Sequence, residues 1–337
     1  IGQILSATIS FFAMFLVLYW RYGFFHSLSF KQVNWPEIRE FALLLLPLVI
    51  SGSLSIINQI VDKTIASGLD PGSIAALNFS ARVWNIPLSL LAVPIATAIF
   101  PTFSELALNG SARVEYESRL DKTLGVSFYL MIPSTFFLFF LSEPIVRLFF
   151  ERGAFNPQAT ALTAFVNKMY VIGLFAHATS PILAKVFYSF KNTATPLIIS
   201  AVCVGLNIIL NILLSRILGA GGIALATSIV MILNFILYTL FLKKYLNPFS
   251  RRLAAETVKI ILSSIPIGIV CYFSLPYFQN ATAASLNGFI SLAIKVAVVG
   301  VVSVIPLFAL SRAFKLESYA FLKSYALGLL KRFKKGT

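Results

Sequence analysis

Polar side chains recur at helical spacing inside two strongly apolar runs of the sequence. Each of two sets has successive spacings of four, three and four residues, which puts its members on one face of a helix. The two sets are Ser51, Ser55, Asn58 and Asp62, and Asn78, Arg82, Asn85 and Ser89. Two later apolar runs add further oxygen-bearing side chains, which are Asn207, Asn211 and Thr227.

A carboxylate near carboxamide and hydroxyl oxygens suits a hard cation such as Na⁺. With a rise of about 1.5 Å per residue, Asp62, Asn211 and Thr227 each lie roughly 8–12 Å from one end of their runs. They are therefore predicted to share one depth. Two alternatives stay open for Asp62: it could pair with Lys63 or Arg82, or it could reach the outer interface.

Arg82 is the cation at this depth, and its guanidinium group is a fixed charge that can bind phosphate through paired N–H donors. The alternative is a side chain that extends its charged end to the membrane surface. Asn78 and Asn85 share its helical face and are candidate substrate contacts. A hydrogen bond between helices is the more ordinary role for them, and for Asn234.

The composition identifies the elements that must position these residues. The chain has 337 residues, of which 58% are hydrophobic and 12% charged, with a mean hydropathy of +0.88. That is about half the charge of a soluble domain, so we predict an all-α polytopic membrane protein. A spanning helix needs about 20 apolar residues, and nine runs qualify: 1–20, 41–67, 74–100, 122–142, 160–184, 196–217, 221–242, 257–277 and 287–311.

Basic residues alternate between the loops. The loops on one side of the nine runs hold 20 of the 27 Lys and Arg residues, and the loops on the opposite side hold three. Because basic loops stay in the cytoplasm, the C-terminus is predicted to be cytoplasmic and Ile1 to lie outside, which leads us to expect an odd number of spans upstream. The net charge of +15 then reflects topology and attraction to anionic membrane lipids, and no nucleic acid is implied.

Enzyme motifs are absent: the sequence has no HExxH, GxSxG or P-loop motif, and its two histidines and two isolated cysteines cannot form the usual metal sets. We therefore predict that the chain is not an enzyme and holds no cofactor beyond a coupling ion. The tail over 313–337 mixes apolar and basic residues, which is typical of a helix on the cytoplasmic leaflet. A tail that docks a partner protein is the alternative.

Several segments resemble the MviN/MurJ family of bacterial lipid II flippases, within the MOP exporter superfamily. They are NQIVDKTIASGL (58–69), AALNFSARVWNIPLSLLAVPIATAIFPTFSEL (75–106), IVRLFFERGAFNPQAT (145–160), FYSFKNTATP (187–196) and LNIILNILLSRILGAGGIALATSI (206–229). The resemblance implies two six-helix lobes that form a V around a cationic cavity, followed by two helices that border a hydrophobic groove.

The resemblance divides the chain into four parts and implies that five upstream helices are missing. These parts are the last N-lobe helix with a cytoplasmic linker (1–36), a six-helix C-lobe (37–245), two groove helices (246–312) and the basic tail (313–337). It matches Arg82 to a head-group arginine of the cavity. It also implies a sodium site, which comprises Asp62, Asn207, Asn211, Thr227 and the backbone oxygen of Ile223. Asn211 stands where the family can carry Asp, which removes one negative charge.

The implied function is transport of lipid II, the undecaprenyl-linked peptidoglycan precursor, from the inner to the outer leaflet of the bacterial cytoplasmic membrane by alternating access. One alternative is a related exporter of another polyprenyl-linked oligosaccharide, or a cation-coupled drug antiporter. A second is a non-transporting scaffold that binds other proteins of cell-wall synthesis.

Overall fold

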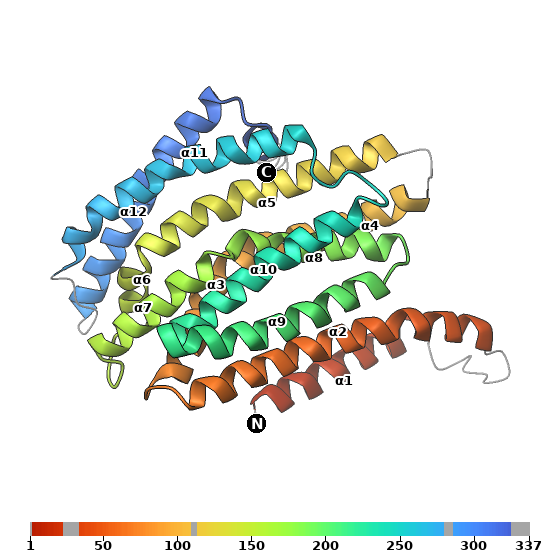
Figure 1. Ribbon diagram of the computed structural model, residues 1–337, viewed down its shortest axis with the longest axis horizontal. Helices are drawn as coiled ribbons and strands as arrows, with labels where there is room; N and C mark the ends of the chain where they lie inside the picture. The colour runs from red at the N-terminus through yellow and green to blue at the C-terminus, as the bar shows by residue number, and fades with distance from the viewer. Residues whose placement is uncertain (1, 23–33, 109–112, 280–285, 325–337) are drawn as a thin grey trace. The chain divides into compact units, whose positions relative to one another are not determined.

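The computed structural model describes residues 2–22, 34–108, 113–279 and 286–324, and these residues are helical with short connections (Figure 1). The chain divides into two compact units at Leu46 and Pro47. The first unit holds α1 (Gly2–Tyr22) and the beginning of α2 (Trp35–Ser67). The linker predicted over residues 23–33 lies outside the described residues. The second unit holds the rest of α2 and all later helices.

Most of the later helices overlap the predicted apolar runs, but a short helix over residues 142–150 lies in the connection between the runs 122–142 and 160–184. The later helices are α3 (Ser73–Pro87), η3 (Leu88–Ala92), α4 (Val93–Leu108), α5 (Arg113–Phe140), α6 (Ser142–Phe150), α7 (Pro157–Val171), α8 (Leu174–Ser189), α9 (Ala194–Leu218), α10 (Ala220–Leu242), α11 (Arg251–Ser274), η4 (Leu275–Phe278) and α12 (Leu286–Ala313). Within the described residues, seven helical segments are long and apolar enough to cross a membrane, and α7 with α8 would make an eighth, bent span. In α1, the corresponding apolar stretch is the shorter Leu5–Arg21.

The second unit is a bundle whose helices pack in the order α11, α5, α8, α10 and α9 (Figure 1). Its core is aromatic and aliphatic: Phe103, Tyr116 and Phe187 are fully buried, and the rings of Phe103 and Tyr116 stack with centroids 5.0 Å apart. Helix α12 packs against α11. These two helices are the pair that the family resemblance assigns to the groove.

Two spans depart from straight helices, for different reasons. Pro87 lacks a backbone N–H, and the helix continues after it as the π-helical turn η3 before α4 begins. The span of α7 and α8 bends by 45° near Gly173, where there is no proline. There the hydroxyl of Ser228 on α10 donates to the carbonyl oxygens of Met169 and Tyr170, at 2.6 and 2.9 Å.

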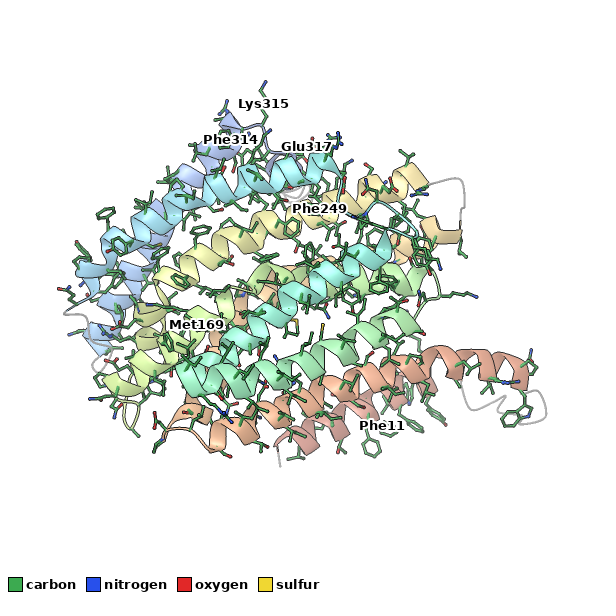
Figure 2. The ribbon with its side chains drawn as sticks, viewed as in Figure 1. Phe11, Met169, Phe249, Phe314, Lys315 and Glu317 are labelled. Carbon is green, nitrogen blue, oxygen red and sulfur yellow. The ribbon has the colours of Figure 1, made fainter. Side chains whose placement is uncertain are left out.

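The connections that the charge pattern assigns to one side also contact each other. The Glu117 carboxylate accepts a bond from the backbone N–H of Asn247, and Glu256 accepts one from the N–H of Ser318, both at 2.8 Å. The chain turns after α12 at Phe314 and Lys315, and Glu317 then pairs with Arg252 at the beginning of α11 (Figure 2). Residues 317–324 form a further helical segment, while the tail predicted beyond residue 324 lies outside the described residues.

Candidate functional site

A chain of hydrogen bonds joins α2 to α9 through the residues predicted for a cation site. The Asn211 carboxamide nitrogen donates to the Asp62 carboxylate at 2.6 Å and to the Asn207 oxygen at 2.7 Å. Asn58, one turn before Asp62, donates to the other carboxylate oxygen at 3.5 Å. Asp62 and Asn211, which the sequence could place only at a common depth, are therefore in direct contact, and Asn207 is bonded to Asn211.

Oxygen atoms around this chain lack partners within the protein. The carboxamide oxygens of Asn58, Asn211 and Asn234 are buried without a hydrogen bond. A cavity of about 160 Å³ lies between α2, α9 and α10, and its lining includes Ser51, Ser55, Asn58, Asn207 and Asn234. Unpartnered buried oxygens are costly, and they are the ligand type that Na⁺ prefers. The ligand types suit a hard cation, although neither Asp62 nor Asn211 lines this cavity.

The remaining two members of the predicted sodium set pair with each other. The Thr227 hydroxyl donates to the backbone oxygen of Ile223 at 3.1 Å, within α10. In the described part of the chain, no hydrogen bond joins either residue to Asp62, Asn207 or Asn211. The structure thus brings together three of the five predicted residues and leaves the other two on the neighbouring helix.

Arg82 does not pair with Asp62 in the part of the chain that the structure describes. Its guanidinium group lies over the ring of Phe79, with the carbon 5.4 Å from the ring centroid. Asn78, Arg82 and Asn85 are all exposed on α3. Asn85 donates to the Ala81 oxygen of its own helix at 2.7 Å, so the bond between helices that was the ordinary expectation does not form there. It forms instead at Asn234, which donates to the Cys203 sulfur at 3.5 Å.

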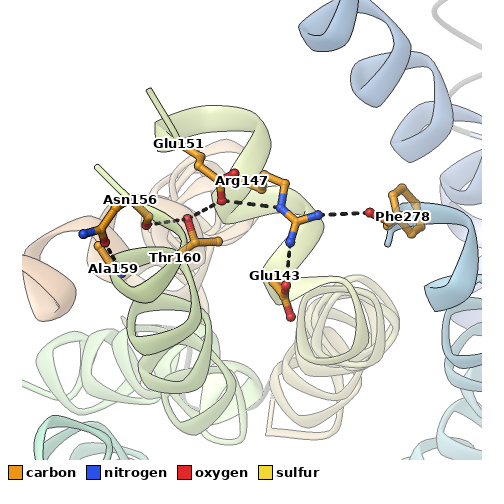
Figure 3. A network of polar contacts seen from close by, with 7 residues as sticks. All are labelled: Glu143, Arg147, Glu151, Asn156, Ala159, Thr160 and Phe278. Carbon is orange, nitrogen blue, oxygen red and sulfur yellow. Dashed lines mark hydrogen bonds and ion pairs between the residues drawn. The ribbon is translucent and has the colours of Figure 1, made fainter. Parts of the chain in front are cut away.

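The connection between α6 and α7 contains a polar network that the sequence did not reveal (Figure 3). Arg147 pairs with Glu143 at 2.7 Å and with Glu151 at 3.4 Å, and it also donates to the Phe278 backbone oxygen at 3.0 Å. Glu151 accepts a bond from the Thr160 hydroxyl at 2.7 Å. The i, i+4 spacing of the three charged residues was the available signal. Phe278 lies 131 residues from Arg147 in the sequence, and no sequence pattern indicates that the two are in contact.

Comparisons with known proteins identify the family to which the chain is similar. The model of the family described as "Lipid II flippase MurJ" matches residues 1–292. A "Probable lipid II flippase MurJ" of Rhizobium tropici is 30% identical over 242 residues, which are 71% of this chain and 45% of the relative. A protein of the same name from Thermotoga maritima is 30% identical over 68% of this chain and 46% of its own length.

Solved structures show the same relationship. A structure described as "Lipid II flippase MurJ, inward closed conformation" matches with a TM-score of 0.60 and 29% identity, and covers 83% of this chain and 56% of that one. A MATE transporter structure matches with a TM-score of 0.53 at 20% identity, over 81% of this chain and 64% of that one, which is a likeness of fold alone. The chain spans about half the length of the curated relatives it matches. From its match to the family model, the chain belongs to the MurJ family of lipid II flippases.

Proposed function

We propose that this chain contributes a C-lobe (37–245) and two groove helices (246–312) to a flippase that moves lipid II across the bacterial cytoplasmic membrane. The observation that carries the proposal is the exposed polar face of α3, where Arg82 lies on a membrane-spanning helix without an acidic partner among the described residues. A charge at that position is costly in lipid and normally faces a cavity or a ligand. A diphosphate head group is a ligand of matching charge.

The rest of the transport cycle follows as part of the same proposal. Arg82 binds the diphosphate, Asn78 and Asn85 offer hydrogen-bonding groups on the same face, and the polyprenyl tail stays in lipid along α11 and α12. Alternating access to the two sides of the membrane then moves the head group. Lipid II and the surrounding membrane lipids are the proposed partners, with the C-terminus in the cytoplasm.

Na⁺ is the proposed coupling ion, held by Asp62 together with the carboxamide oxygens of Asn207 and Asn211. Support comes from the unpartnered Asn211 oxygen and from the position of the site between α2 and α9. Without the ion, the Asn211 amino group bridges Asp62 and Asn207. Rotation of this carboxamide by half a turn would present its oxygen instead. The ion would supply the charge that holds α2 to α9 in one state of the cycle.

The test is externalisation of lipid II in cells depleted of their own flippase, with expression of the protein that carries this sequence. We expect the wild type to restore externalisation, Arg82→Ala to abolish it at equal membrane abundance, and Arg216→Ala to behave as the wild type. Arg216 is also an exposed arginine, near the end of α9, and serves as the matched control.

Three results would contradict parts of the proposal. Rescue by Arg82→Ala would remove Arg82 from the substrate path while leaving the activity in place. Failure of a well-inserted wild type to externalise lipid II, with transport of another polyprenyl-linked sugar, would reassign the substrate. Normal cell-wall synthesis with no transport by any variant would favour a scaffold.

A further inference from the structure

A second exposed arginine shares a cavity with Arg82. The cavity has a volume of about 900 Å³ and lies between α3, the end of α6, the loop after it and α7. Its lining includes Arg82 on α3 and Arg152 in the loop between α6 and α7. Arg82 is nine residues into its helix, roughly 14 Å along the axis at about 1.5 Å per residue, whereas Arg152 lies outside the membrane-spanning segments. The cavity therefore connects membrane depth with the end of the bundle.

Within the described part of the chain, the two positive charges of this cavity have no acidic partner. No acidic side chain lines it among the described residues. The two acids nearest to Arg152 in sequence are already engaged, since Glu143 and Glu151 both pair with Arg147 (Figure 3). Arg152 itself donates to the backbone oxygen of Phe149 at 2.7 Å, which fixes the guanidinium group but leaves its charge unpaired.

The remaining walls suit a head group with both apolar and polar parts. Three aromatic rings form one wall: the Phe79 centroid lies 4.8 Å from that of Phe150 and 5.1 Å from that of Phe155. Thr163 is only 1% exposed and lines the cavity, yet its hydroxyl oxygen has no hydrogen-bond partner in the protein. A buried hydroxyl without a partner is costly, and a ligand oxygen would be a suitable acceptor for it.

The loop geometry holds Arg152 in place. Gly153 has φ of +59°, a left-handed conformation that favours glycine and turns the chain away from α6. Asn156 then caps α7, where its side-chain oxygen accepts a bond from the backbone N–H of Ala159 at 2.9 Å, and Pro157 occupies the first position of the helix. Arg152 is thus presented by an ordered turn between two helices.

We propose that this cavity is a phosphate-binding vestibule for the lipid head group, in which Arg152 is a second diphosphate-binding residue beside Arg82. The inference rests on the proposed function, because the transported lipid supplies the diphosphate. A head group bound at Arg82 can pass to Arg152 within the same cavity. Guanidinium groups bind phosphate oxygens through paired N–H donors, and the rings offer apolar contact to the remainder of the head group.

The test is binding of undecaprenyl diphosphate to the purified protein that carries this sequence, in nanodiscs of zwitterionic lipid. We expect Arg152→Gln to weaken binding about tenfold or more, since a hydrogen bond to a charged group is usually worth at least one factor of ten. Arg152→Lys should recover part of the affinity. Arg216→Gln, the matched control outside the cavity, should bind as the wild type, and equal thermal unfolding midpoints will show that each variant is folded.

Competition with other phosphate compounds shows whether the cavity prefers a polyprenyl diphosphate, a free diphosphate or an ordinary membrane phospholipid. Inorganic diphosphate and phosphatidylglycerol should each displace the probe only at much higher concentration. Equal displacement by either would overturn the assignment to a polyprenyl diphosphate head. Identical affinities for Arg152→Gln and Arg216→Gln would overturn the role of Arg152.

The same variants separate this inference from the proposed function. If the wild type externalises lipid II and Arg152→Gln binds and transports normally, the vestibule is wrong and the flippase stands. If the wild type does not externalise lipid II but binds undecaprenyl diphosphate in an Arg152-dependent way, the vestibule stands and the proposed function fails.

Discussion

Asp62 is a carboxylate on a membrane-spanning helix whose hydrogen-bond donors are neutral. In the described residues it accepts bonds from Asn58 and Asn211 and forms no ion pair with Lys63 or Arg82, which were the alternative partners. Neutral donors reduce the cost of burying a charge but do not cancel it. A bound cation would cancel it, and that is the physical reason for placing the coupling ion here.

Replacing this carboxylate tests the coupling ion directly. A ligand at a hundred times its dissociation constant stabilises a protein by about 2.7 kcal/mol, so Na⁺ should raise the thermal unfolding midpoint of the wild type above that in choline chloride. We expect Asp62→Asn to abolish this difference. Asp70→Asn, an exposed acid in the turn after α2, should retain it. Equal Na⁺ stabilisation of Asp62→Asn and the wild type would remove the ion from this site.

Two of the residues whose spacing defined the predicted site are in contact in the structure, and their role in ion binding stays a prediction. Asp62 and Asn211 lie on faces that the periodicity of their runs identified, and they meet at 2.6 Å. Thr227 was predicted at the same depth and Ile223 came from the family resemblance alone, and in the structure these two residues bond to each other. Arg152 was visible only as one letter of a quoted motif, because its role depends on a cavity built by three separate helices.

At the scale of elements, apolar length predicts where the helices are but not where they break. All nine runs became helical, since burial in lipid requires every backbone group to bond within its own segment. The break between α7 and α8 escaped prediction, and Ser228, whose hydroxyl contacts the carbonyls at the break, lies 58 residues from Tyr170. Phe249 is a similar case: it follows α10 in the chain but packs on Phe128 of α5, with ring centroids 6.3 Å apart (Figure 2).

Ser228 therefore provides a test of how the broken span is held. A bend frees backbone carbonyls of the helix, and the Ser228 hydroxyl contacts two of them. We expect Ser228→Ala to lower the free energy of unfolding by about 1–3 kcal/mol, the usual cost of an unsatisfied buried group. Ser53→Ala should change it by less than about 0.5 kcal/mol, because Ser53 is exposed and bonds within its own helix. Unfolding of detergent-purified variants measures both, and equal values would show that packing alone holds the bend.

At the scale of the whole molecule, the loops between helices fall into the same two groups by their Lys and Arg content and by their contacts with each other. Connections rich in Lys and Arg meet through pairs such as Glu117 with Asn247. The others meet through Arg147 and Phe278. The charge pattern predicts that the basic end faces the cytoplasm. Because the basic connections contact each other at one end of the bundle, they must all lie on the same side of the membrane.

Cysteine labelling can determine which end faces the cytoplasm. The native Cys203 and Cys271 are 3% and 0% exposed, so they give little background with a membrane-impermeant maleimide. We expect Arg216→Cys to be labelled in intact spheroplasts and Lys244→Cys to be labelled only after permeabilisation. Both positions are exposed, and they lie at opposite ends of the bundle, so they are predicted to face opposite sides of the membrane. The reverse pattern would invert the topology and place the Arg152 vestibule on the cytoplasmic side, where it would receive the head group before transport. Labelling of both positions in intact cells would contradict the alternation of the spans, since α10 alone separates position 216 from position 244 and would then not cross the membrane.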